Sequence, residues 1–102
     1  MSKEPDAIKI IQTRRMILGN LNRLYDSPLQ VRTLRNVMIG FDEHYDLSLL
    51  KKDLMYLKQK GYIEFVDEKI GGFASFIDKY VGLTAKGKEI AEQTANDPAL
   101  EI

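Results

Sequence analysis

Lysine and arginine side chains are the groups in this chain whose number and spacing suit a definite chemistry. Residues 51–60 contain four lysines and one acid, Asp53, while residues 9–35 contain six basic side chains and one acid, Asp26. Ammonium and guanidinium groups pair with phosphate oxygens, and each such contact to a nucleic acid makes binding more dependent on salt. The two segments therefore favour a surface that binds a polyanion. The alternative is that these lysines only solvate the exposed face of a helix, as lysines do on many surface helices.

Groups for catalysis or metal binding are scarce. The chain has no cysteine and one histidine, His44, so thiol chemistry, cysteine-based zinc sites and a histidine-based triad lack the residues they need. His44 stands beside Asp42 and Glu43, but three polar residues in one loop are far more often solvated than bound to a metal. The carboxylates of residues 67–78 have no accompanying nucleophile. We therefore expect no enzyme activity, no metal and no cofactor.

The distribution of acidic residues hides the local excess of positive charge. Lysine plus arginine number 15, as do aspartate plus glutamate, so the formal net charge is zero. A free-standing nucleic-acid binder usually carries a basic excess. The acids of this chain concentrate in residues 42–46 and 64–78. We therefore expect the positive charge on helices and the negative charge on the loops between them.

The length of 102 residues fits one domain with one hydrophobic core, and a domain this small is a candidate for homodimer formation. No apolar stretch approaches the roughly 20 residues that span a bilayer, and residues 1–6 lack the apolar core of a signal peptide. We expect a cytoplasmic protein without membrane contact. Its organisation would be a flexible N-terminus over 1–6, a domain over 7–95 and an irregular tail over 96–102.

The first sixty residues contain three segments with helical periodicity. Ile10, Ile17 and Leu21 mark the apolar side of a helix over residues 7–25. Arg14 falls among these apolar positions. We expect its guanidinium to extend past the edge of the core, in preference to a buried ion pair or a dimer contact.

The second helix has two possible starts. Ser27 and Gln30 have the spacing of a capping box, and Pro28 suits the first helical position. The alternative is that Leu29 and Gln30 form a short strand that pairs with a later ribbon. In either case the helix is expected to end near Gly40.

The third helix is expected over residues 46–60, with Asp46 as its N-cap. Leu47, Leu50, Leu54 and Leu57 recur at the spacing of an inward face. A projection at about 100° per residue places a second set on the opposite face. This set consists of Ser48, Lys52, Met55, Tyr56 and Gln59, flanked by Lys51 and Lys58.

The last third of the chain has the pattern of a β-ribbon followed by a helix. Residues 62–66 and 79–83 are rich in β-branched and aromatic side chains, and Gly71-Gly72 lies between them as a turn. Thr84 is a suitable N-cap for the final helix. The expected fold class is therefore mainly α with a small antiparallel β-ribbon.

Two segments resemble the winged helix-turn-helix superfamily of DNA-binding proteins. Residues 53–63 are similar to the "L-x-x-L-x-x-x-G-aromatic/aliphatic-Ile" end of its recognition helix, and residues 82–91 look like the "L-T-x-x-G" that follows its wing. The resemblance implies a dimeric transcription regulator whose third helix enters the major groove of duplex DNA. A further resemblance, to small winged-helix proteins of Mu-like bacteriophages, rests on residues 14–18, 54–63 and 83–87 and implies a phage or prophage origin.

The resemblance also implies which side chains bind. The candidate base or phosphate contacts that it gives are Ser48, Lys51, Lys52, Met55, Tyr56 and Gln59. We also expect Arg32 and Arg35 to hold phosphates, and we expect Lys69, Phe73 and Phe76 in the wing. For Met55 and Tyr56, packing against the wing or a partner subunit is an equal alternative.

Two departures from the superfamily pattern favour a different partner. Asp42, Glu43 and Asp46 precede the third helix, where their carboxylates would compete with phosphates for its positive end. The expected wing, residues 67–78, is acidic and apolar, which suits a protein interface better than a phosphate backbone. The alternative function is therefore a winged-helix protein-interaction module that uses the apolar wing together with Met55 and Tyr56.

Overall fold

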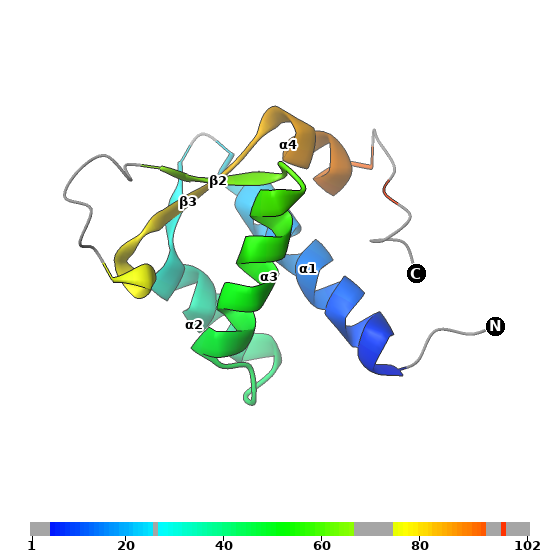
Figure 1. Ribbon diagram of the computed structural model, residues 1–102, viewed down its shortest axis with the longest axis vertical. Helices are drawn as coiled ribbons and strands as arrows, with labels where there is room; N and C mark the ends of the chain where they lie inside the picture. The colour runs from blue at the N-terminus through cyan, green and yellow to red at the C-terminus, as the bar shows by residue number, and fades with distance from the viewer. Residues whose placement is uncertain (1–4, 26, 67–74, 94–96, 98–102) are drawn as a thin grey trace.

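The computed structural model describes residues 5–25, 27–66 and 75–93, together with Asp97. Within these ranges, four α-helices and a three-stranded antiparallel sheet form a mainly helical α+β fold (Figure 1). The elements are α1 (Pro5–Arg23), β1 (Leu29–Gln30), α2 (Val31–Phe41), α3 (Leu47–Gln59), β2 (Ile63–Val66), the 3-10 helix η1 (Phe76–Asp78), β3 (Tyr80–Leu83) and α4 (Ala85–Ala91). The expected mainly α fold with a small antiparallel sheet is confirmed.

Among the helices of the described ranges, none has the length and apolar composition needed to cross a membrane.

The sheet has the strand order β1-β3-β2, so β3 is its central strand. Leu29 of β1 lies opposite Val81, and Ile63 of β2 lies opposite Leu83. The expected capping box of Ser27 and Gln30 is wrong, because Gln30 is extended and its side chain makes no capping hydrogen bond. The backbone before α2 is instead occupied by pairing with β3, which is the strand alternative.

The first two helices lie close to their expected ranges. α1 begins at Pro5, two residues before the expected start, and ends at Arg23. α2 ends at Phe41, within one residue of the expected end near Gly40, with Asp42 as its C-cap. Neither change alters the inward face of α2, where Val31, Leu34 and Met38 are buried.

The boundaries of α3 are fixed by local features that the sequence predicts. The carboxylate of Asp46 accepts a hydrogen bond from the Leu49 amide at 2.8 Å, which satisfies a free N–H of the first turn. Gly61 follows the helix with a φ of 80°, a left-handed conformation that favours glycine. Between these ends Leu50, Leu54 and Leu57 are fully buried. The opposite side of α3 is therefore left at the surface of the molecule, at the front of Figure 1.

A close backbone approach fixes α4 against the end of α3. Thr84 caps α4 by accepting from the Gly87 amide at 3.0 Å, and its hydroxyl donates to the carbonyl oxygen of Gly61 at 2.6 Å. Gly87 packs directly on the carbonyl oxygen of Tyr62, so that a Cβ at this position would collide with it. The glycine of the "L-T-x-x-G" pattern is thus required by packing, and it helps to hold the α3–β2 turn in place.

Candidate functional site

Four exposed side chains follow one line along α3, and we call this line the outer stripe. It consists of Ser48, Lys52, Met55 and Gln59, all of which are exposed. Their spacing places them within about 60° of one another around the helix, over about 16 Å of its length. Met55, the apolar member of this line, is 47% exposed. The expected outward face is confirmed at these four positions.

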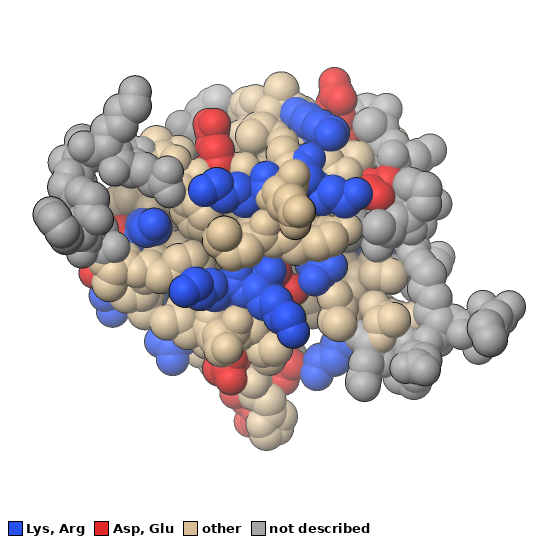
Figure 2. All heavy atoms as spheres, in the orientation of Figure 1, with Lys and Arg blue, Asp and Glu red and all other residues tan. Residues whose placement is uncertain are grey.

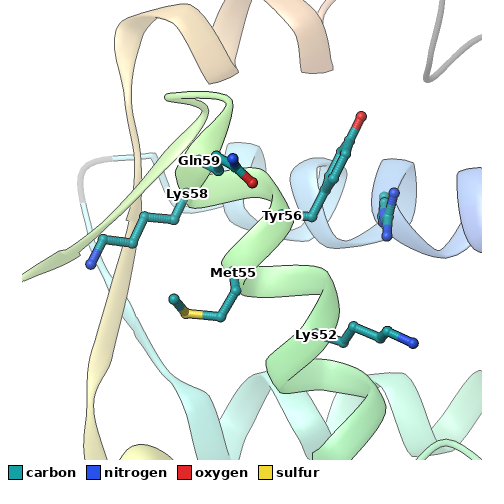
Figure 3. Close-up of a pocket in the computed structure, with 6 residues that line it drawn as sticks. Lys52, Met55, Tyr56, Lys58 and Gln59 are labelled. Atoms are coloured by element: carbon teal, nitrogen blue, oxygen red, sulfur yellow. The ribbon is translucent and has the colours of Figure 1, made fainter.

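The outer stripe borders a shallow, open depression with a volume of about 640 Å³. Arg14 of α1 lines it together with five residues of α3, namely Lys52, Met55, Tyr56, Lys58 and Gln59 (Figure 3). In Figure 3 Tyr56 and Lys52 extend to one side of α3, whereas Met55 and Lys58 extend to the other. The depression therefore combines cationic groups with apolar and amide groups from one helix face.

The only acidic residue of α3, Asp53, is withdrawn from the exposed face. Its side chain is 10% exposed, and Arg14 Nε donates to its Oδ1 at 3.1 Å. The Tyr45 hydroxyl donates to its Oδ2 at 2.7 Å. Burial and the neighbouring Asp53 carboxylate raise the pKa of Tyr45 above its ordinary value. The exposed surface of α3 consequently carries lysines without an exposed carboxylate.

Arg14 is the clearest correction to the sequence interpretation. Its side chain is 17% exposed and pairs with Asp53, instead of extending past the core edge as expected. The guanidinium carbon also lies 3.7 Å from the centroid of the Tyr56 ring. Arg14 thus holds α1 against α3 through an ion pair and a cation–π contact. We call Arg14, Tyr45, Asp53 and Tyr56 the Asp53 network.

Tyr56 is accordingly less available for binding than the outer stripe. It is half-buried and packs against the core, and its ring supports Arg14. The packing alternative named the wing or a partner subunit, whereas Tyr56 packs on the core and on Arg14 of α1. Met55, by contrast, lies on the outer stripe.

Lysines from two elements gather around a pair of aromatic rings on the sheet side of α3. Phe65 and Phe76 meet edge to face with their centroids 6.0 Å apart. Lys58 Nζ lies 5.1 Å and Lys79 Nζ 5.5 Å from the Phe65 centroid, and Lys51 Nζ lies 5.7 Å from the Phe76 centroid. Cation–π contacts of this kind hold ammonium groups close to the ring faces. We call these three lysines the sheet-side rim.

The two arginines of α2 occupy different environments. Arg32 Nη2 pairs with Asp78 Oδ1 of η1 at 2.8 Å, and this contact lowers the pKa of Asp78. Arg32 therefore reaches η1, the same short segment that Lys51 contacts through Phe76. Arg35 is half-buried, and its Nε is shielded from solvent with no hydrogen-bond partner among the described residues. The structure thus brings Arg32, but not Arg35, to the edge of the lysine-rich surface.

One carboxylate of the acidic lead-in to α3, Asp42, is paired with a lysine. Lys9 Nζ lies 3.0 Å from Asp42 Oδ2, and the His44 amide donates to the other Asp42 oxygen, so that the pKa of Asp42 is lowered. Glu43 and His44 approach within 3.4 Å of each other and are both exposed. The described residues contain no group of three histidine or carboxylate side chains able to hold a metal.

Figure 2 shows the resulting distribution of charge on the face that α3 occupies. Lysine and arginine side chains gather across its middle, over α3, while most of the acidic side chains visible there lie toward its edges. A net charge of zero is therefore compatible with a locally positive face.

The expected wing falls largely outside the described residues, which omit Lys69, Phe73 and the Gly71-Gly72 turn. Phe76 is described, and it is half-buried against Phe65. Among the described residues of that segment, therefore, no aromatic side chain is exposed. The alternative in which the apolar wing binds a protein partner gains no support from them.

One polar contact at the far end of α3 was not anticipated. The Tyr62 hydroxyl donates to the carboxylate of Asp97, whose Oδ2 lies 4.0 Å from Lys60 Nζ. Burial and this carboxylate raise the pKa of Tyr62 to about 12. Asp97 is buried although it lies in the segment expected to be an irregular tail. No local pattern in the sequence connects these two residues.

Comparisons with protein-family models, with curated proteins and with solved structures found no match to this chain.

Proposed function

We propose that this protein is a winged helix-turn-helix DNA-binding protein, a transcription regulator that reads duplex DNA with α3. The observation that carries the proposal is the withdrawal of Asp53 behind α3 by Arg14 and Tyr45. It leaves lysines on the exposed surface of the helix without an exposed carboxylate to oppose a phosphate backbone. Electrostatic pairing with phosphates supplies most of the non-specific affinity of such proteins.

The arrangement of the elements supports this function. α2 and α3 are joined by the short connector 42–46, and the antiparallel strands β2 and β3 follow α3. The three buried leucines of α3 hold one side of the helix to the core and leave the outer stripe facing outward. The major groove of B-DNA, about 12 Å wide, admits an α-helix. A helix anchored in this way can enter the groove while its buried side stays packed against the core.

The flanks of α3 supply groups for phosphate contacts. On the sheet side, Lys51 and Lys58 of the sheet-side rim rest on aromatic rings that keep their ammonium groups near the helix. Lys52, on the outer stripe, extends toward the opposite side (Figure 3). When a helix lies in the major groove, cations on both its flanks face the two phosphate backbones that border the groove.

Fluorescence anisotropy with a labelled random-sequence duplex, measured from low to moderate salt, tests the proposal. The double variant K51A/K52A should bind more weakly and reduce the slope of log affinity against log salt by about two, because each lost phosphate contact removes about one counterion. The matched control R15A/R23A removes the same charge from exposed positions of α1. It should weaken DNA binding less than K51A/K52A does.

Two outcomes would contradict the proposal in different ways. Absence of binding at micromolar protein in low salt would exclude DNA as the ligand. Equal losses for K51A/K52A and the control R15A/R23A would show that only total charge matters, and that α3 is not the contact surface.

We also propose that the regulator acts as a homodimer. Ile10 of α1 and Leu24, just after α1, are 45% and 48% exposed. Covering these two side chains with a second copy of the chain would remove apolar surface from water, which favours association. Sedimentation velocity over a range of protein concentrations tests this assignment, and a monomer at every concentration, with and without duplex DNA, would contradict it.

A further inference from the structure

The outer stripe carries a specific set of base-reading groups. In the major groove, arginine and lysine pair with guanine, asparagine and glutamine with adenine, acidic side chains with cytosine, and apolar groups contact the thymine methyl. The C-terminal half of the stripe presents Met55 and Gln59, both exposed. Neither is a guanine reader or a cytosine reader.

The arginine that borders the same depression is not free to read guanine. The Nε of Arg14 is bonded to Asp53 at 3.1 Å, and its guanidinium lies over the Tyr56 ring. Turning Arg14 toward a base would break both contacts and leave a buried carboxylate without its cation, which is strongly unfavourable. The Asp53 network therefore removes the strongest guanine-binding group from this part of the surface.

Met55 and Gln59 are spaced for neighbouring base pairs. They are four residues apart, which places them about 40° apart around α3 and about 6 Å apart along it. In helices that lie in the major groove, residues three to four positions apart contact successive bases, so this spacing suits two neighbouring base pairs. An A·T pair offers both groups a partner, since adenine presents N6 and N7 and thymine presents its C5 methyl in the same groove.

The exposure of Met55 supports an apolar contact at this position. It is 47% exposed in the middle of an otherwise polar stripe. Placing its thioether against a thymine methyl would remove apolar surface of both partners from water. A flexible methionine side chain also adapts well to a contact of this kind.

We propose that the C-terminal half of the outer stripe selects two successive A·T pairs, with Gln59 on the N6 and N7 edge of adenine and Met55 against the thymine methyl. The proposal rests on the proposed DNA-binding function and specifies which sequence that function prefers.

Selection of bound sequences from a random duplex library gives the first test. Wild-type protein should enrich two adjacent A·T pairs, and Gln59→Ala should lose the adenine preference at one of them, by about 10-fold in relative affinity. Gln59→Glu should move that position toward cytosine, because a carboxylate accepts from cytosine N4. Gln12→Ala, a matched glutamine change on α1, should leave the selected sequence unchanged.

Base analogues test the same contacts atom by atom. Replacing thymine by uracil in the selected duplex removes only the C5 methyl and should weaken wild-type binding by about 4-fold. The same replacement should not change the affinity of the Met55→Ala variant for the duplex. Replacing adenine by 7-deazaadenine removes N7 and should weaken the wild type but not Gln59→Ala. Circular dichroism of each variant checks that the exposed substitutions leave the fold intact.

The outcomes separate the two proposals. If no duplex is bound, the proposed function and this inference fall together. If DNA is bound, but the selected pairs are G·C or the wild type is indifferent to uracil and 7-deazaadenine, this base assignment is overturned while DNA binding stands.

Discussion

The Asp53 network gives the sharpest prediction about stability. We consider the replacement of Arg14 by methionine, which keeps an unbranched apolar stem and removes the guanidinium. The variant leaves the Asp53 carboxylate, 10% exposed, with the Tyr45 hydroxyl as its remaining partner within the network. Breaking a buried ion pair by removing one partner costs about 3 to 5 kcal/mol.

The expected value lies below that range for two structural reasons. The Arg14 side chain is 17% exposed, so water reaches the site and screens the carboxylate once the arginine is lost. The Tyr45 hydroxyl, 2.7 Å from Asp53 Oδ2, also remains in place. We therefore expect Arg14→Met to lower the free energy of unfolding by about 2 to 3 kcal/mol.

A double-mutant cycle isolates the pair from the surrounding packing. Asp53→Leu alone should cost about 1 to 2 kcal/mol, because the unpaired guanidinium is better able to reach water and the Tyr45 hydroxyl loses its acceptor. The double variant should be less destabilised than the sum of the two single variants by about 2 kcal/mol. Urea unfolding at neutral pH, followed by circular dichroism, measures all four proteins.

This reasoning would be refuted if the destabilisation of the double variant equalled the sum of the two single variants within about 0.5 kcal/mol. Substitutions at independent sites are additive within that margin. Such a result would mean that Arg14 and Asp53 do not depend on each other, and the account of why α3 exposes no carboxylate would lose its basis.

Gly87→Ala should lower the free energy of unfolding by more than about 2 kcal/mol in urea titrations, because its Cβ would meet the Tyr62 carbonyl oxygen. Gly19→Ala, whose Cβ would lie in open space on α1, should instead raise the free energy of unfolding by up to about 1 kcal/mol. The Tyr62 pKa, raised to about 12 from an ordinary 10, means that folding favours the neutral phenol, so this stabilisation is complete below pH 10 and is lost as the pH rises to 12. Phenolate absorbance should show two tyrosines ionising late, Tyr45 and Tyr62, and Tyr62→Phe should remove one of them. Ionisation of Tyr62 near pH 10 would contradict the buried contact. Arg32→Ala should return the lowered pKa of Asp78 toward 3.8 in an NMR titration of its carboxyl group, and an unchanged pKa would exclude the ion pair as its cause.

The amino-acid sequence by itself predicts the features of this protein that depend on near neighbours. Asp46 caps α3, Gly61 leaves it in a left-handed conformation and Thr84 caps α4, as expected. A cap or a turn is made by groups within a few residues of each other, so the sequence contains both partners. The helical period likewise predicts the outer stripe, because the opposite side of α3 carries the leucines that must be buried.

Contacts between distant segments account for the expectations that were wrong. Residues 29–30 form a strand instead of a capping box because β3, some fifty residues later, pairs with them. Arg14 is engaged because Asp53, 39 residues away, is brought against it. Neither partner can be identified from local spacing, because an ion pair or a strand pairing depends on how the helices and strands pack.

The candidate site divides in the same way. Its residue types and its helical face were fixed by the sequence, which places Lys52, Met55 and Gln59 on one exposed line of α3. Tertiary structure alone decided which charged and aromatic groups remain available, since it buries Asp53 against Arg14 and sets Tyr56 beneath that arginine. The physical reason is that a side chain's availability for binding depends on what the fold places next to it, and the nearest charge to Asp53 comes from a different helix.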